Sequence, residues 1–138
     1  MKSCILNNEV SFHDSTLLSV KLRDQDLILT IDFVTAPSIV IGELSDTEYF
    51  TLQQVEIICS DAKTKMPEFW VNTTKAEVHP NPENPMREIM KNSLECRELH
   101  ISGWAHENGW VEWIIEASSY VITWKEETSH PKISMQNK

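Results

Sequence analysis

The stretch that decides the fold is residues 16–33, which read TLLSVKLRDQDLILTIDF. Large apolar side chains alternate with polar ones on both sides of Asp24-Gln25, and a period of two is typical of half-buried strands. A two-residue loop at Asp24-Gln25 turns the stretch into a β-hairpin with its apolar side chains on one face, as burial requires. The predicted cross-strand pairs are Leu22 with Leu27, Val20 with Leu29, and Leu18 with Ile31.

Further strands are expected on both sides of this hairpin. Ser38–Glu43 follows Pro37 as a short strand, and Glu68–His79 is rich in strand-forming residues but alternates poorly. Phe50–Cys59 alternates clearly: Val55, Ile57 and Cys59 are expected inward, with Gln54 and Glu56 outward. Segment 79–85 holds three prolines and is predicted to be a loop.

A helix is expected near residues 85–95. Asn84 is a suitable capping residue, and Pro85 suits the first helical position. The apolar residues that follow have the spacing of one helix face, namely Met86, Ile89, Met90 and Leu94. A helix of about ten residues is marginal alone, so we expect it to pack on the sheet.

The last third of the chain predicts another hairpin, closed by the three-residue loop Glu107-Asn108-Gly109. This loop is preferred to a two-residue Asn108-Gly109 turn because it keeps the apolar side chains of both strands on one face. A turn at Ser118-Ser119 then extends that face and places Trp113 opposite Trp124. The inward residues are Leu99, Ile101, Gly103, Ala105, Val111, Trp113, Ile115, Ala117, Tyr120, Ile122 and Trp124.

The predicted fold is therefore α+β. A mainly antiparallel, twisted β-sheet of hairpins carries one principal helix near residues 85–95. Residues 1–127 are expected to form a single β-rich domain, and 128–138 a flexible C-terminal tail, because the apolar pattern stops there. The oligomeric state is left open.

Charge narrows the choice of partner. The 138 residues carry a net charge of −9, with acidic side chains in excess in both halves of the chain. Such a surface repels phosphate groups, which argues against nucleic acid or membrane and favours a basic protein partner. The three cysteines are far apart, and no apolar leader or membrane-spanning run is visible, so we expect a reduced, cytoplasmic protein.

Motifs for catalysis or cofactor binding are weak. His13-Asp14-Ser15 contains the residue types of a catalytic triad, but neighbours on an extended segment point to opposite sides. We expect Asp14 and Ser15 to bond local backbone groups and His13 to be partly buried, so that the motif is structural. The His and Asp spacings do not suit a shared metal ion, and no metal or cofactor is expected. We therefore predict that the protein is not an enzyme.

One predicted surface remains as a candidate binding site. The face opposite the apolar residues of the last hairpin holds two tryptophans among acids and histidines, and tryptophan anchors many protein interfaces. Its candidate partner-binding residues are His100, Trp104, His106, Trp110, Glu112 and Glu116. The alternative is that the helix at 85–95 covers this face as a second core layer.

Residues 11–20, SFHDSTLLSV, followed by 26–32, DLILTID, resemble the opening of a group of small bacterial β-rich proteins. Some of those are assigned as immunity proteins of polymorphic-toxin systems. The resemblance implies a β-rich, non-catalytic protein that neutralises a toxin. Together with the net charge of −9, it predicts a binding protein that neutralises a basic toxin by protein–protein contact. Two alternatives stay open: a small-ligand-binding or enzymatic β-domain with its site near His13 or the His100–Trp110 face, and a subunit of a larger assembly.

Overall fold

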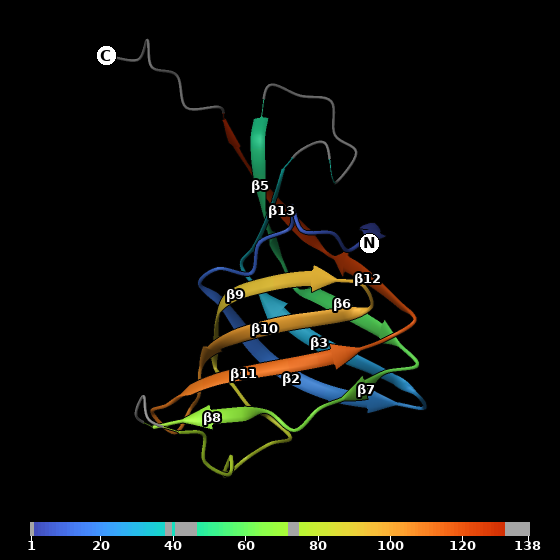
Figure 1. The fold of residues 1–138 in the computed structure, drawn as a ribbon. Helices are drawn as coiled ribbons and strands as arrows, with labels where there is room; N and C mark the ends of the chain where they lie inside the picture. Colours follow the sequence, from blue (N-terminus) through green and yellow to red (C-terminus); the bar gives the residue numbers. More distant parts are fainter. Residues whose placement is uncertain (1, 38–39, 41–46, 72–74, 132–138) are drawn as a thin grey trace, which may run out of the picture.

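A computed structural model describes residues 2–37, 40, 47–71 and 75–131, and all thirteen of their regular elements are β-strands (Figure 1). The strands are β1 (Lys2–Ile5), β2 (Ser15–Arg23), β3 (Asp26–Asp32), β4 (Val34–Pro37), β5 (Thr47–Gln53), β6 (Val55–Ser60), β7 (Lys63–Thr64), β8 (Glu68–Trp70), β9 (Glu88–Glu95), β10 (Glu98–Trp104), β11 (Trp110–Glu116), β12 (Ser119–Trp124) and β13 (Glu126–Pro131).

Ten of these strands form one antiparallel sheet that folds back on itself. Its order is β1-β12-β6-β3-β2-β9-β10-β11-β7, with β8 also paired to β11. Strands β9, β10 and β11 lie in front of β2, β3 and β6 in Figure 1, so the sheet makes two layers. Apolar side chains of both layers, such as Leu29, Ile57, Ile101 and Ile115, are fully buried in one core.

The β2–β3 hairpin confirms part of its predicted register. Leu22 pairs with Leu27 and Val20 with Leu29, around a turn at Asp24-Gln25. The third predicted pair is wrong, because an irregularity between Leu17 and Ser19 shifts the strand by one residue. A one-residue shift exchanges the two faces of a strand. Leu17 therefore pairs with Ile31 and is buried, while Leu18 is 53% exposed.

The predicted helix near residues 85–95, and with it the α+β class, is wrong. Residues 88–95 form strand β9, which pairs with β10 along its whole length. Met90 is an extra residue in this pairing, since Ile89 lies opposite Gly103 and Lys91 opposite Ser102. A bulge of this kind turns a period of two into a spacing close to that of a helix. The pairing with β10 then outweighs the weak helix preference of the segment.

The β10–β11 hairpin has the predicted faces in a different register. Its loop is His106-Glu107-Asn108, because the Ala105 N–H donates a hydrogen bond to the carbonyl oxygen of Gly109. Within this loop, Asn108 adopts a left-handed backbone conformation, with φ of 64°. The register differs from the predicted one by two residues, and such a shift leaves every side chain on its own face. All eight predicted inward residues of this hairpin are buried.

Strand β12 does not continue this hairpin. It crosses to the other layer and pairs with β6 and β1, so the expected pairing of Trp113 with Trp124 is wrong. Tyr120, Ile122 and Trp124 are nevertheless buried as predicted, because the strand reaches the same core from the opposite side.

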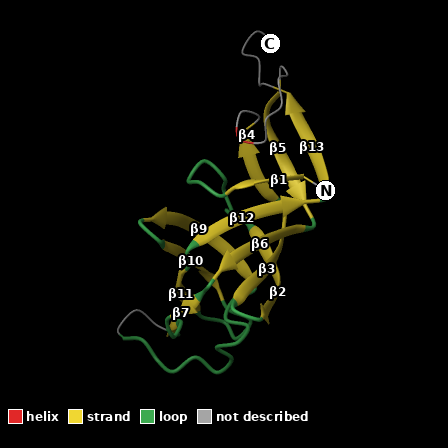
Figure 2. Cartoon of the chain, turned by 90° about the vertical axis from the view of Figure 1, so that its right-hand side faces the viewer, coloured by secondary structure: helices red, strands yellow, loops and turns green. Residues whose placement is uncertain are grey.

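Three strands of the large sheet continue into a smaller one, formed by β13, β5 and β4 (Figure 2). The breaks between the two sheets lie at Phe33 and Gln54, both with positive φ, and at Lys125. The expected strand 50–59 is thus divided, although Val55, Ile57 and Cys59 do point inward. Strand β13 extends into the range expected to be a tail, while 132–138 lie outside the described residues. In the expected strand Ser38–Glu43, Val40 alone is described, and it is not in a strand.

Candidate functional site

The outer face of the β8–β11–β10–β9 layer carries its side chains in cross-strand rows. The described elements include no helix that could cover this face, and side chains along it such as Trp104, Glu112 and Lys91 are exposed. The alternative that a helix at 85–95 buries it is therefore wrong. The four rows, read across the strands, are Trp70, Trp110, Trp104 and Glu88; Glu68, Glu112, Ser102 and Lys91; Ile114, His100 and Ser93; and Lys63, Glu116, Glu98 and Glu95.

The first row places three tryptophans on neighbouring strands. Trp110 lies directly opposite Trp70 on one side and Trp104 on the other. The rings of Trp104 and Trp110 meet edge to face, with centroids 4.9 Å apart and an interplanar angle of 82°. Trp104 is 44% exposed. This arrangement leaves aromatic surface exposed to solvent. Monomeric proteins usually bury such surface unless it binds a partner or ligand.

Glu112 connects this aromatic row to the acidic row beside it. Its carboxylate accepts a hydrogen bond of 3.3 Å from the indole N–H of Trp110. Glu112 also lies directly opposite Glu68 of β8. Two carboxylates thus stand beside the tryptophans, and Glu112 lines both of the main hollows on this face.

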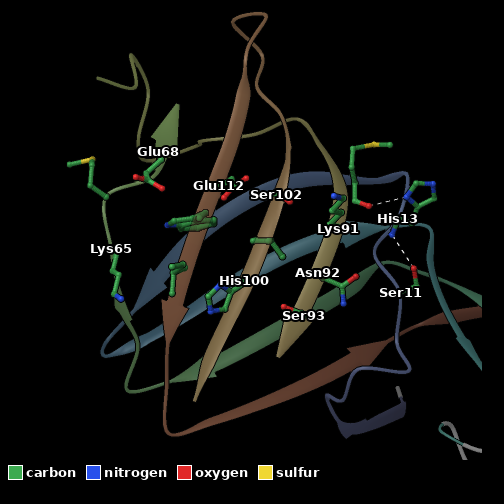
Figure 3. Close-up of a pocket in the computed structure, with 15 residues that line it drawn as sticks. Ser11, His13, Lys65, Glu68, Lys91, Asn92, Ser93, His100, Ser102 and Glu112 are labelled. Atoms are coloured by element: carbon green, nitrogen blue, oxygen red, sulfur yellow. Dashed lines mark hydrogen bonds between the residues drawn. The ribbon is translucent and has the colours of Figure 1, made fainter. Parts of the chain in front are cut away.

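The larger hollow is a trough of about 730 Å³ that crosses strands β11, β10 and β9 (Figure 3). Lys65 and Glu68 lie along one side of it, and Ser11 and His13 along the other. His100, Ser102 and Ser93 come from the strands between them (Figure 3). The trough has the size of a ligand site but is lined by charges of both signs.

The Glu98 carboxylate joins His100 to Lys65 beside the trough. The Nε2–H of His100 donates to a Glu98 carboxylate oxygen at 3.2 Å, and Lys65 reaches the other oxygen at 3.4 Å. The hydrogen bond from His100 and the charge of Lys65 hold the pKa of the Glu98 carboxyl below its usual value. Across the strands, His100 lies opposite Ile114 and Glu116 lies opposite Glu98.

Each residue of the His13-Asp14-Ser15 motif makes its own contact, and the three side chains do not form a joint site. Asp14 has φ of 64°, and this turn brings its carboxylate within 3.3 Å of the His13 ring, which neighbours on a straight strand would not achieve. The Nδ1–H of His13 donates to the carbonyl oxygen of Met90 at 2.9 Å. Ser15 is buried and donates to the carbonyl oxygen of Phe33 at 2.9 Å. His13 is exposed, not partly buried as expected, and Ser15 bonds a distant segment instead of a local one.

Two asparagine amides fasten the segment around this motif to β9. The Asn92 side chain accepts from the Phe12 N–H at 2.8 Å and donates to the Val10 carbonyl at 2.9 Å. Asn8 makes the same pair of bonds to the backbone of Leu94, at 2.6 and 2.9 Å. These amides satisfy backbone groups that a neighbouring strand would otherwise pair. They hold the segment that forms one side of the trough.

The structure brings most of the predicted partner-binding residues onto one face. His100, Trp104, Trp110, Glu112 and Glu116 lie in its rows, and His106 lies exposed in the adjoining loop. Among the residues of the same face that sequence reasoning missed are Trp70, Glu68, Glu88 and Lys91. Trp70 and Glu68 belong to a strand of only three residues, too short to show alternation. Glu88 and Lys91 lie in the segment predicted to be helical.

The described part of the chain holds no cluster of three or more histidine, cysteine or acidic side chains suited to a metal ion. Its elements also include no helix long and apolar enough to cross a membrane. Comparison with known protein families, curated proteins and solved structures finds no match for this chain.

Proposed function

We propose that this is a non-enzymatic binding protein that neutralises a basic toxin by protein–protein contact, as an immunity protein does. The observation that carries the proposal is the uncovered outer face of the β8–β11–β10–β9 layer. It combines a row of three tryptophans with six glutamates, against the two lysines in its rows. Interfaces use tryptophan as an anchor, and complementary charge directs the partner to it.

Charge supports a basic partner on a larger scale as well. The net charge of −9 attracts a basic protein at long range and speeds its association, which matters for an inhibitor that must act before its target does. The resemblance of residues 11–33 to the opening of small bacterial β-rich proteins, some of which are assigned as immunity proteins, points in the same direction. His13 and Ser15 each bond a backbone carbonyl, which supports a structural role for this motif and not a catalytic one.

The test is co-expression with a toxin-like protein from an adjacent reading frame. Bacteria that produce both proteins should survive, and the purified pair should associate tightly at low salt and more weakly as salt is raised. The double variant Trp104→Ala/Glu112→Gln should lose protection. The control is Glu56→Gln, which removes one charge from the opposite layer. Protection that survives the double variant, or the absence of any adjacent toxin that the protein binds, would refute the proposal.

The trough favours a second candidate function, the binding of a small polar ligand. Its volume of about 730 Å³ suits such a ligand, and it contains both His13 and His100. Thermal-shift measurements with carboxylates, phosphates and amines would test it. A ligand-induced rise in melting temperature that His100→Ala removes, while the unliganded stability stays unchanged, would support this function over protein binding.

A further inference from the structure

The tryptophan row forms a second hollow beside the trough. This cleft, of about 500 Å³, is lined by Trp70, Val71, Trp104, Asn108, Trp110 and Glu112. The three tryptophans and Glu112 come from three neighbouring strands whose paired backbone holds them in place, and Val71 and Asn108 come from the residues that follow β8 and β10. The cleft is mainly aromatic, with one carboxylate in its lining.

The position of that carboxylate is defined by the row itself. Glu112 accepts the indole N–H of Trp110, which keeps a negative charge beside the aromatic rings. The edge-to-face contact between Trp104 and Trp110 fixes the angle between the two rings. Aromatic faces and a carboxylate together form a site for a cation, because the face of an indole attracts positive charge and the carboxylate pairs with it.

We propose that the tryptophan cleft binds an arginine side chain of the basic partner, an inference that rests on the proposed function. A planar guanidinium stacks on an aromatic ring and still directs N–H groups to a carboxylate in the same plane. A lysine ammonium is a compact, strongly hydrated charge and loses more hydration in an aromatic cleft. Trp104 provides the exposed ring, and Glu112 provides the negative charge.

A neutral sugar also stacks on tryptophan, but it fits this cleft less well. Sugar recognition needs several polar groups, and this cleft has two polar side chains, Asn108 and Glu112, of which Glu112 already accepts the Trp110 N–H. The net charge of −9 attracts a cation and does nothing for a neutral ligand. Arginine is therefore the occupant that both the cleft and the whole molecule favour.

The test is a titration of the full chain with the capped peptide Ac-Gly-Arg-Gly-Arg-Gly-NH2, followed by NMR of the five indole N–H signals. Matched peptides carry citrulline, which is nearly the same size and uncharged, or lysine. Shifts should be confined to Trp70, Trp104 and Trp110, since Trp113 and Trp124 are buried and serve as internal controls. Affinity should fall at least about tenfold with citrulline and several-fold with lysine.

Variants identify the groups responsible. Trp104→Ala should weaken arginine-peptide binding about tenfold, Trp104→Phe less, and Glu112→Gln several-fold, while Glu56→Gln leaves it unchanged. Equal binding of the arginine and citrulline peptides, or binding of cellohexaose at the same indoles in place of arginine, would overturn the inference. If the toxin still binds through this face while the arginine peptide does not, the inference fails alone. If the peptide binds and no toxin does, the proposed function fails.

Discussion

The bonds of Asn92 lead to a quantitative prediction about the motif region. Asn92→Ala removes a hydrogen bond of 2.8 Å from the Phe12 N–H and one of 2.9 Å to the Val10 carbonyl. Each such bond contributes roughly 0.5–1.5 kcal/mol, and a buried group left without a partner costs about 1–3 kcal/mol. Phe12 and Val10 are buried, with 0% and 1% exposure, so water replaces the lost amide poorly. We expect a destabilisation of about 2 kcal/mol.

Urea unfolding measures this change, and hydrogen exchange locates it. The Phe12 amide should exchange faster in Asn92→Ala, whereas amides in the β2–β3 hairpin should follow the global stability alone. Asn92→Asp should lie between wild type and alanine, because a carboxylate accepts from Phe12 but has no N–H for the Val10 carbonyl. Ser93→Ala, on the outward side of the same strand, is the control and should change stability by less than about 0.5 kcal/mol.

A stability of Asn92→Ala equal to that of Ser93→Ala would refute this reasoning. It would mean that the Asn92 amide contributes little to holding the segment before β2, which would then depend on apolar packing and on other bonds such as those between Asn8 and Leu94. The same result would remove Asn92 from the side chains that hold this side of the trough.

Three further predictions concern the core, pH and salt. Gly103→Ala should destabilise the fold by about 1–3 kcal/mol in thermal unfolding, because a Cβ there collides with the carbonyl oxygen of Glu88; a wild-type melting temperature would contradict this. Stability should fall as pH rises above about 9, since burial raises the pKa of Cys59 from 9.0 and of Tyr120 from 10.0 to about 12 each. The unfolded chain then releases protons that the folded state retains; urea midpoints that do not decrease between pH 8 and 11 would disprove it. Raising salt should slow association with the basic partner, and Glu112→Gln should reduce that dependence in stopped-flow measurements; an unchanged salt slope would argue against Glu112 at the interface.

The candidate site could be predicted in part because alternation along a strand is a local property. The predicted outward residues His100, Trp104, Trp110, Glu112 and Glu116 lie on the outer face, although the predicted register is two residues away from the real one. Alternate residues of a strand face the same side of the sheet, so a register error of two residues leaves each side chain on its predicted face. The row of tryptophans could not be predicted, because Trp70 joins it only through pairing of β8 with β11, forty residues further along the chain.

Irregular strands account for the errors in the fold. A bulge at Met90 gave β9 the apolar spacing of a helix, and a shift after Leu17 exchanged the faces of Leu17 and Leu18. Such irregularities leave no clear mark in the sequence, because they arise where two layers must curve to meet. The crossing of β12 to the other layer could not be predicted either, because it depends on pairing with β6, a strand far away in the sequence.

The sequence by itself determined that the protein is β-rich, which side chains of β6, β10, β11 and β12 face inward, and that the surface is strongly acidic. These properties depend on the two-residue repeat of an extended backbone and on composition. The tertiary structure alone decided which strands are neighbours, that residues 88–95 form a strand, and that three tryptophans stand in one row beside Glu112. The reason is that strand pairing joins segments far apart in the chain, and its energy depends on the packing of the whole core.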